Sequence, residues 1–242
     1  MNDHSNQCLL RRLEATQTLW GRFYLQAHMA QQKLRAQWLA YSGDALKRGF
    51  DILVSSILLI LLTPFLLLIG LAVWVEDGGS ILFAQTRVGQ FGRLFKMYKI
   101  RSMCPDADQK LKDLLGKNQQ KEGITFKLKD DPRMTRVGRW LRKYSFDELP
   151  QLYNVLIGDM SLVGPRPPVP REVAMYRLSD RRRLAAKPGI TCIWQISGRS
   201  DISDFTDWVR LDLAYIDEWS LWLDCKILLA TIPAALFGRG AR

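Results

Sequence analysis

The sequence has little histidine, and its cysteines follow no recognised pattern. Of 242 residues only two are histidines, His4 and His28, and both precede the longest uncharged run of the chain. If the chemistry lies after that run, Ser-His-Asp triads, Cys-His dyads and histidine-rich zinc sites are excluded. The four cysteines show no C-x-x-C spacing, which argues against a thiolate metal site or a disulfide framework and favours a reducing compartment. An active site there must use carboxylates, lysine, arginine and hydroxyl groups.

Acidic residues are too few to balance the basic ones. The chain has 35 lysines and arginines against 24 aspartates and glutamates, a formal net charge of +11. This excess predicts an anionic partner, which can be nucleic acid, lipid headgroups or a phosphorylated substrate. No groove-reading motif is present, and the aromatic residues cluster with apolar residues rather than with arginine. We therefore expect no nucleic acid partner.

The uncharged run extends from Ile52 to Val75. As a straight helix it would be about 36 Å long, enough to cross a hydrocarbon core of about 30 Å. Hydropathy alone therefore predicts a membrane span. Two features favour a helix that turns at Thr63-Pro64 and leaves by the face it entered: Pro64 removes a helix hydrogen bond, and basic residues flank both ends of the run. The residues alone leave both topologies open.

Residues 1–45 are expected to form a polar helical extension. From Leu9 to Leu34, apolar or small residues recur at alternating spacings of four and three, so that one helical face meets a partner. That face could pack on its own domain or on the bilayer surface, or it could form a homodimer through a coiled coil. The predicted domains are thus the extension at 1–45, the membrane helix at 46–76 and a further domain at 77–242.

Three more segments have readable secondary structure. Residues 81–100 predict two short strands around a turn from Val88 to Gly92. Residues 103–122 predict a charged helix or loop. The apolar tail Ser220–Phe237 predicts a tryptophan-bearing helix that lies in a membrane interface.

Adjacent carboxylates at Asp147 and Glu148 are the sharpest chemical signal. Ser145 and Glu148 fit an S-x-x-E capping box at the start of a helix, which would explain them without catalysis. The functional alternative is that the two carboxylates hold Mg²⁺ together with substrate phosphates and that one attacks phosphorus. The helix N-terminus and neighbouring arginines would then stabilise the transferring phosphoryl group.

Basic residues precede this pair. Arg136, Arg139 and Lys143 share one face of a predicted helix, with Arg133 and Arg142 nearby. This set predicts either a solvated basic face or a phosphate-binding wall, because fixed guanidinium groups match phosphate geometry.

Further candidates follow the pair. Two prolines flank Arg166 and fix its backbone, which either preorganises it to meet an anion or makes only a structural turn. Gly198 and Arg199 belong to another Gly/Pro-rich cluster. Asp212 lies on an otherwise apolar predicted helix and would by itself be a partnered surface or core acid.

Taken in order, five segments resemble the bacterial sugar transferase family, the monotopic phosphoglycosyl transferases that act on polyprenyl phosphates. They are KRGFDILVSSILLILLTPFLLLIGLAV, FKMYKIRSM, DPRMTRVGRWLRKYSFDELPQLYNVLIGDMSLVGPRP, KPGITCIWQISGR and LDLAYI. The resemblance covers roughly residues 46–242. Larger members carry several membrane spans before this core, so it implies nothing about residues 1–45.

The resemblance implies a fold. We expect an α+β protein, mostly helical with a short β-hairpin. A re-entrant membrane helix, kinked by Pro64 next to Thr63, and interfacial amphipathic helices would anchor it to one membrane face.

The resemblance also implies site residues. The family's Asp-Glu pair falls on Asp147 and Glu148. The resemblance implies that Asp147 is the nucleophile and that Glu148 binds Mg²⁺ or lies next to the residue that does. Both are therefore candidate catalytic residues and candidate metal ligands. Lys99 is implied as catalytic and Arg101 as a site residue. Asp212 falls on a late catalytic acid.

Substrate binding is assigned to a second set. The family's Pro-Arg-Pro loop falls on Pro165, Arg166 and Pro167, with Arg166 as the phosphate contact. We add Arg142, Gly198 and Arg199 as candidate substrate-binding residues.

The expected reaction is transfer of a sugar 1-phosphate from a UDP-sugar to undecaprenyl phosphate, with release of UMP through an aspartyl-phosphosugar. It would be the first membrane step of a bacterial surface glycan, on the cytoplasmic face of the inner membrane, with Mg²⁺. The alternative is a membrane-anchored binding or scaffold protein that uses the basic patch and the N-terminal helix.

Overall fold

The computed structural model describes residues 19–105, 107, 109–110, 131–196 and 204–236. The chain divides into two compact units, Met1–Gly49 and Phe50–Arg242. In the first unit the described backbone is the beginning of helix α2 (Leu19–Asp77), as the sequence predicted for this part of the extension. The side chains of the predicted partner-facing stripe lie outside the described residues, so dimerisation stays a prediction.

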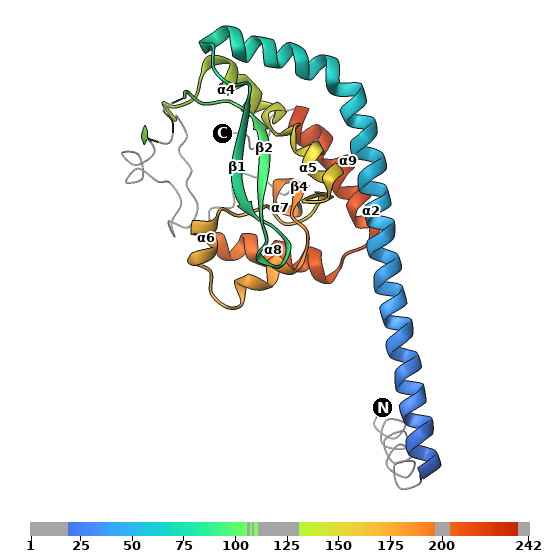
Figure 1. The fold of residues 1–242 in the computed structure, drawn as a ribbon. Helices are drawn as coiled ribbons and strands as arrows, with labels where there is room; N and C mark the ends of the chain where they lie inside the picture. The colour runs from blue at the N-terminus through green and yellow to red at the C-terminus, as the bar shows by residue number, and fades with distance from the viewer. Residues whose placement is uncertain (1–18, 106, 108, 111–130, 197–203, 237–242) are drawn as a thin grey trace. The chain divides into compact units, whose positions relative to one another are not determined.

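The second unit continues α2 and contains short helices, 3₁₀ turns and two small sheets (Figure 1). After α2 the elements are β1 (Leu82–Val88), η1 (Gln90–Gly92), β2 (Leu94–Ile100), α4 (Arg136–Lys143), η3 (Phe146–Glu148), α5 (Gln151–Ile157), β3 (Ser161–Val163), α6 (Pro170–Ala174), η4 (Asp180–Ala185), β4 (Gly189–Thr191), α7 (Ile193–Ile196), α8 (Phe205–Asp217) and α9 (Leu221–Leu236). This confirms a mostly helical fold with a short hairpin.

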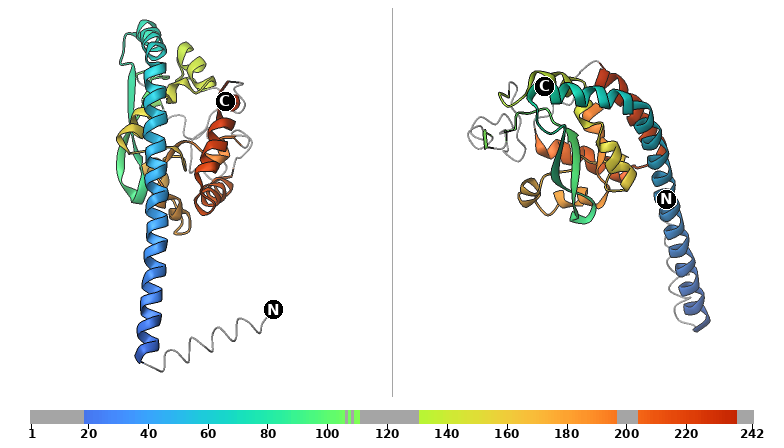
Figure 2. Two further views of the ribbon diagram at one scale, coloured as in Figure 1. Left: turned by 90° about the vertical axis from the view of Figure 1, so that its right-hand side faces the viewer. Right: turned by 45° about the horizontal axis from the view of Figure 1, so that its top comes forward.

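Strands β1 and β2 form the predicted hairpin. They pair antiparallel, with Leu82 opposite Ile100 and Val88 opposite Leu94. The turn is a 3₁₀ element in which Phe91 has φ 55° and Gly92 has φ 82°, so the chain reverses through left-handed backbone. The views in Figures 1 and 2 show the hairpin as a long ribbon along one side of the second unit.

Strands β3 and β4 form a second, parallel pair, which the sequence did not predict. Ser161 lies opposite Gly189 and Val163 opposite Thr191. A Cβ on Gly189 would stand 2.1 Å from the backbone nitrogen of Gly164, so only glycine allows this close approach. The pairing places the loop that begins at Gly164 directly beside the start of β4.

The main core joins the hairpin to the helices behind it. Its buried side chains come from β2, α5, β3, α8 and α9 and from the turn before β3: Phe95, Met97, Leu152, Val155, Met160, Leu162, Val163, Tyr215 and Ile227. The Tyr215 hydroxyl lies 2.7 Å from a carboxylate oxygen of Asp224 and 3.0 Å from the Val163 carbonyl oxygen. This contact ties α8 and α9 to the strand that leads into the Gly164 loop.

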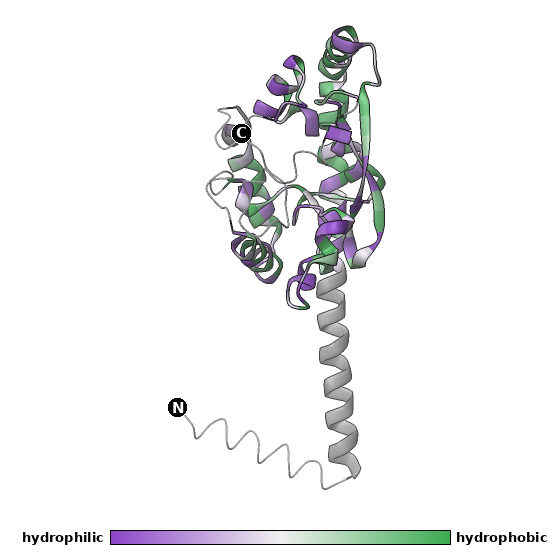
Figure 3. Ribbon diagram, turned by 90° about the vertical axis from the view of Figure 1, so that its left-hand side faces the viewer, coloured by the Kyte–Doolittle hydropathy of each residue, from purple (hydrophilic) through white to green (hydrophobic). Residues whose placement is uncertain are grey.

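The apolar run of α2 is largely exposed. Among the described residues, Ser42–Asp77 is the one helical stretch long and apolar enough to cross a membrane. Only 11% of its most apolar 18-residue segment is buried. Ile60, Leu67 and Val75 are 74%, 69% and 70% exposed, and Figure 3 shows green, hydrophobic turns along this run. A core helix would bury this surface, so the exposure points to membrane association.

Pro64 lies inside α2 without ending it. The helix is continuous from Leu19 to Asp77, and the Thr63 hydroxyl donates to the Leu59 carbonyl at 2.6 Å. Figure 1 shows the ribbon changing direction in the teal part of α2, within the apolar run. Re-entrance into the membrane stays a prediction.

Helix α9 covers the tail for which an interfacial helix was predicted. Asp224 and Ile227 are 1% exposed, whereas Trp222 and Leu229 are 66% and 65% exposed. One face therefore packs on the core and the other is apolar and open. Its position in a bilayer interface stays a prediction.

The start of the apolar run is attached to the core by Asp51. Its buried carboxylate accepts hydrogen bonds from the Ser161 hydroxyl at 3.1 Å and from the Leu162 N–H at 3.0 Å. An Asp51→Ala variant leaves both donors buried without this partner, so we expect a loss of about 1–3 kcal/mol in the free energy of unfolding. Chemical denaturation in detergent measures it, and exposed Asp44→Ala on the same helix is the control. An Asp51→Ala variant as stable as that control would contradict the assignment.

Candidate active site

A cavity of about 750 Å³ lies between the hairpin, the segment after β2, α4, η3, the loop after β3 and α6. Seven of its lining residues are basic and two are acidic: Arg87, Lys99, Arg101, Arg133, Arg142, Arg166 and Arg171, with Asp147 and Glu172. The cavity therefore suits a multiply charged anion. It brings together six residues that the sequence singled out, because Lys99, Arg101, Arg133, Arg142, Asp147 and Arg166 all line it.

Asp147 lies in η3 with its side chain in the cavity wall and 5% exposed. Ser145, just before η3, has left-handed backbone with φ 58° and ψ 22°. The Phe146 ring packs against Phe65 at 5.0 Å between centroids and stacks on Tyr144 at 5.7 Å. These ring contacts hold the turn that points Asp147 into the cavity.

The capping-box interpretation of Ser145 and Glu148 is wrong. Ser145 makes no side-chain capping hydrogen bond, and the Glu148 carboxylate instead meets the Lys99 ammonium at 2.8 Å. A capping serine normally has extended backbone, whereas Ser145 is left-handed and the helix that it precedes is a single 3₁₀ turn. Glu148 is therefore held by a residue of β2.

The two adjacent carboxylates face different spaces. Asp147 lines the large cavity, and Glu148 lines a small one of about 20 Å³ next to Gln151 and Gln195. Lys99, Arg87 and Arg166 line both. These three cations thus lie at the boundary of the two spaces, and the Glu148–Lys99 ion pair holds the lysine there.

The Pro-Arg-Pro loop is clamped by backbone contacts. The carbonyls of Pro165 and Pro168 accept from the N–H groups of Gly189 and Val88, each at 2.9 Å. The Pro167 carbonyl accepts from the Arg87 guanidinium, also at 2.9 Å. The prolines flanking Arg166 are buried, whereas Arg166 is exposed and lines the cavity, so a fixed loop presents it.

Arg87 is a cavity residue that the sequence analysis did not place in the site. It is 7% exposed, and its Nε and Nη2 atoms donate to the Gln85 side-chain oxygen at 3.0 and 2.6 Å. Burial, with a smaller contribution from Arg166, lowers its pKa to about 10. Gln85 and Arg87 alternate along one strand and so share a face, which is the signal that could have found the pair.

The arginines around α4 divide between the two interpretations. Arg133 and Arg142 line the cavity, and Arg142 Nε donates to the Ser102 hydroxyl at 3.1 Å. Arg136, Arg139 and Lys143 are exposed and outside the lining. Of this basic set, Arg136, Arg139 and Lys143 thus form a solvated face, whereas Arg133 and Arg142 belong to the cavity wall.

Asp212 does not line the large cavity. It is 2% exposed and forms an ion pair with buried Arg183, which also donates to the Tyr176 hydroxyl at 2.8 Å. Burial raises the pKa of Asp212, and the Arg183 guanidinium opposes that shift. Arg183 lines a small space beneath the Pro-Arg-Pro loop with Pro165 and Arg166. Asp212 thus has no direct access to the large cavity, and its predicted catalytic role stays a prediction.

Gly198 and Arg199 lie outside the described residues. Residues 111–130, which include most of the predicted charged segment, lie outside them too.

Comparison with known proteins gives the chain its family. The family model described as "Bacterial sugar transferase" matches residues 42–238. The chain belongs to the bacterial sugar transferase family.

Several proteins are similar to this family member. Galactosyl transferase CpsE of Streptococcus agalactiae serotype III is 56% identical over 167 residues, which are 69% of this chain and 37% of the relative. Exopolysaccharide production protein ExoY of Sinorhizobium fredii is 44% identical over 202 residues, 82% of this chain and 89% of the relative. Undecaprenyl-phosphate galactose phosphotransferase of Salmonella typhimurium is 46% identical over 203 residues, 83% of this chain and 42% of the relative. The chain thus spans less than half of two of them.

The large cavity offers a carboxylate that could bind a metal ion together with a substrate phosphate. Among the described residues no group of three or more His, Cys, Asp or Glu side chains could hold an ion. Mg²⁺, however, is commonly held by one or two carboxylates together with substrate phosphates. The Asp147 carboxylate, at the wall of a cavity rich in basic residues, would fit a Mg²⁺ ion that binds with a phosphorylated substrate rather than in a protein cage.

Two arginines of α4 provide a matched test of the cavity. We expect Arg142→Gln to weaken binding of inorganic pyrophosphate about tenfold or more, because hydrogen bonds to charged groups contribute about 1.5–3 kcal/mol. Arg139→Gln changes an exposed side chain outside the lining and should bind within about twofold of the native chain. Isothermal titration calorimetry in detergent measures both. Equal weakening by the two variants would mean that only net charge matters and would contradict the assigned cavity.

Proposed function

We propose that the chain transfers a sugar 1-phosphate from a UDP-sugar to undecaprenyl phosphate and releases UMP. The observation that carries the proposal is a buried carboxylate, Asp147, in the wall of a cavity with seven basic residues, in a protein with an exposed apolar helix. The Salmonella relative is named as an undecaprenyl-phosphate galactose phosphotransferase, and a Komagataeibacter xylinus relative, 43% identical over 207 residues, as the glucose phosphotransferase.

The first step is a displacement at the phosphorus that bears the sugar. A carboxylate oxygen of Asp147 forms a bond to that phosphorus, and the bond to the bridging oxygen breaks. The electron pair leaves with UMP, and the phosphosugar stays on Asp147 as a mixed anhydride. Negative charge develops on the transferring phosphoryl group and on UMP.

The cations around Asp147 stabilise this charge. Lys99, Arg87 and Arg166 lie at the boundary of the two cavities, fixed by Glu148, Gln85 and the Pro-Arg-Pro loop. Since these groups are already oriented, little reorganisation is needed as charge develops. Mg²⁺, when bound by Asp147 and the diphosphate, would supply further charge neutralisation.

In the second step an oxygen of undecaprenyl phosphate attacks the same phosphorus. The bond to Asp147 breaks, the carboxylate is restored, and the product is an undecaprenyl diphosphosugar. The lipid phosphate is already ionised, so no base is required to remove a proton. This agrees with chemistry built without histidine in residues 50–242.

The proposed setting is the cytoplasmic face of the bacterial inner membrane. The exposed run of α2 and the open face of α9 would lie in the bilayer, with α2 re-entrant at Thr63-Pro64. The cavity would then lie at the height of lipid headgroups, where a soluble nucleotide sugar and a membrane-bound phosphate meet. The glycan that is built is proposed as a surface polysaccharide, in keeping with the ExoY relative named for exopolysaccharide production.

UMP release tests the reaction. With undecaprenyl phosphate and Mg²⁺ present, we expect one member of a panel of UDP-galactose, UDP-glucose and UDP-N-acetylgalactosamine to give UMP, and Asp147→Asn to give at least about 10³-fold less. Exposed Asp207→Asn on α8 is the control and should keep native turnover.

Two results would count against the proposal. Native turnover in Asp147→Asn would remove the covalent step. No release with any UDP-sugar, from folded membrane-bound protein, would favour the scaffold alternative.

A further inference from the structure

The last turn of α2 ends in two acids, Glu76 and Asp77. Carboxylates are unfavourable at the C-terminal end of a helix, where the macrodipole is negative, and this turn contains no basic residue. Their partners must therefore come from elsewhere in the fold. The Asp77 carboxylate pairs with Arg101 and accepts from the Gly79 N–H at 3.2 Å.

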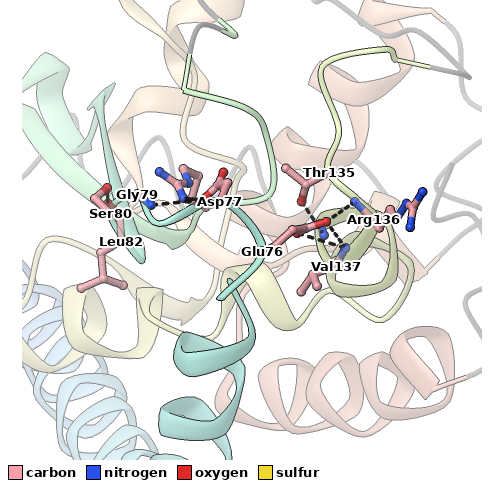
Figure 4. A network of polar contacts seen from close by, with 10 residues as sticks. Glu76, Asp77, Gly79, Ser80, Leu82, Thr135, Arg136 and Val137 are labelled. Atoms are coloured by element: carbon pink, nitrogen blue, oxygen red, sulfur yellow. Dashed lines mark hydrogen bonds and ion pairs between the residues drawn. The ribbon is translucent and has the colours of Figure 1, made fainter. Parts of the chain in front are cut away.

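Glu76 contacts the beginning of α4. One carboxylate oxygen accepts from the Arg136 N–H at 2.7 Å and from the Val137 N–H at 3.2 Å, and the other lies 3.3 Å from Val137 N. Figure 4 shows the Glu76 side chain pointing at these backbone groups, with Thr135 beside them and Asp77 directed to the other side. The contact joins residues 60 positions apart.

The first four N–H groups of α4 have no partner within the helix, and each donates to an acceptor elsewhere. The Thr135 N–H donates to the Ser102 carbonyl at 3.2 Å, and the Gly138 N–H donates to the Thr135 hydroxyl at 2.9 Å. Glu76 takes the two between them. A Cβ on Gly138 would stand 2.1 Å from the Ser102 carbonyl oxygen, so α4 also sits directly against the segment after β2. The position of α4 is thus set by Glu76 and by Ser102.

The other end of α4 leads into the cavity. Arg142 lies in its last turn, lines the cavity and donates to the Ser102 hydroxyl. Asp147 follows only after the left-handed turn at Ser145. A shift of α4 would therefore move a cavity cation and the proposed nucleophile together.

We propose that Glu76 is a positioning residue, which fixes α4, and through it Arg142 and Asp147, to the end of the membrane helix. The role rests on the proposed function for its effect on turnover but not for its effect on anion binding. We expect its reach to matter more than its charge, because its donors are neutral backbone N–H groups, which an amide oxygen of the same reach can also pair.

Three variants separate geometry from charge. Glu76→Gln keeps an acceptor oxygen at the same distance and loses the charge, whereas Glu76→Asp keeps the charge and is one methylene shorter. Glu76→Ala removes both. We expect pyrophosphate affinity to fall about fivefold and UMP release about tenfold in the Ala and Asp variants, and Gln to keep most of both, since misplacement by about 1 Å is enough for such losses.

The measurements are calorimetry with pyrophosphate and turnover with the donor that releases UMP, each per folded protein. Glu218→Ala, an exposed glutamate at the end of α8, is the matched control and should not change either. Native values in Glu76→Ala, or a native Asp variant beside an impaired Gln variant, would overturn the proposal.

If Glu76→Ala does not fold, the other two variants decide, because the proposal expects Glu76→Gln to bind pyrophosphate more tightly than Glu76→Asp. Pyrophosphate affinity does not depend on sugar transfer. A chain without UMP release but with this order of affinities would refute the proposed function and keep the positioning role.

Discussion

Repulsion between like charges is the constraint on which the site depends. Seven basic side chains line one cavity, where partial burial weakens the screening that water provides. The structure gives five of them fixed partners: Arg87 with Gln85 and the Pro167 carbonyl, Lys99 with Glu148, Arg101 with Asp77, Arg133 with Asp131, and Arg142 with Ser102. Protein groups therefore hold these cations in place, which is the preorganisation that the proposed phosphoryl transfer requires.

These partners come from segments far apart in the chain, so the site forms only when the segments dock. The apolar run of α2 is attached to the rest of its unit at both ends by an acid that accepts backbone N–H groups. Asp51 holds β3 through Leu162, and Glu76 holds α4 through Arg136 and Val137. The helix that meets the membrane and the turn that carries Asp147 are thus parts of one connected assembly.

Sequence patterns predicted the structure well where the contacts join residues close together in the chain. Alternation and a glycine-containing turn were enough for the hairpin at 82–100, because pairing across a short turn needs no distant contact. The S-x-x-E pattern at Ser145 failed for the opposite reason. The backbone there follows the packing of Phe146 on Phe65, a residue 81 positions earlier on α2, and no pattern within four residues records that contact. Arg87 was missed because one of its partners, the Pro167 carbonyl, lies 80 positions further along the chain.

The sequence by itself determined the apolar run, the hairpin, the absence of histidine after residue 49 and, through its ordered motifs, the family. Only the tertiary structure decided which of the candidate side chains face one cavity. It placed Arg142 at the cavity wall and Arg139 of the same helix outside it, and it directed Glu148 to Lys99 and Asp212 to Arg183. The physical reason is that periodicity states which residues share a face, whereas packing between distant segments states which neighbour that face meets.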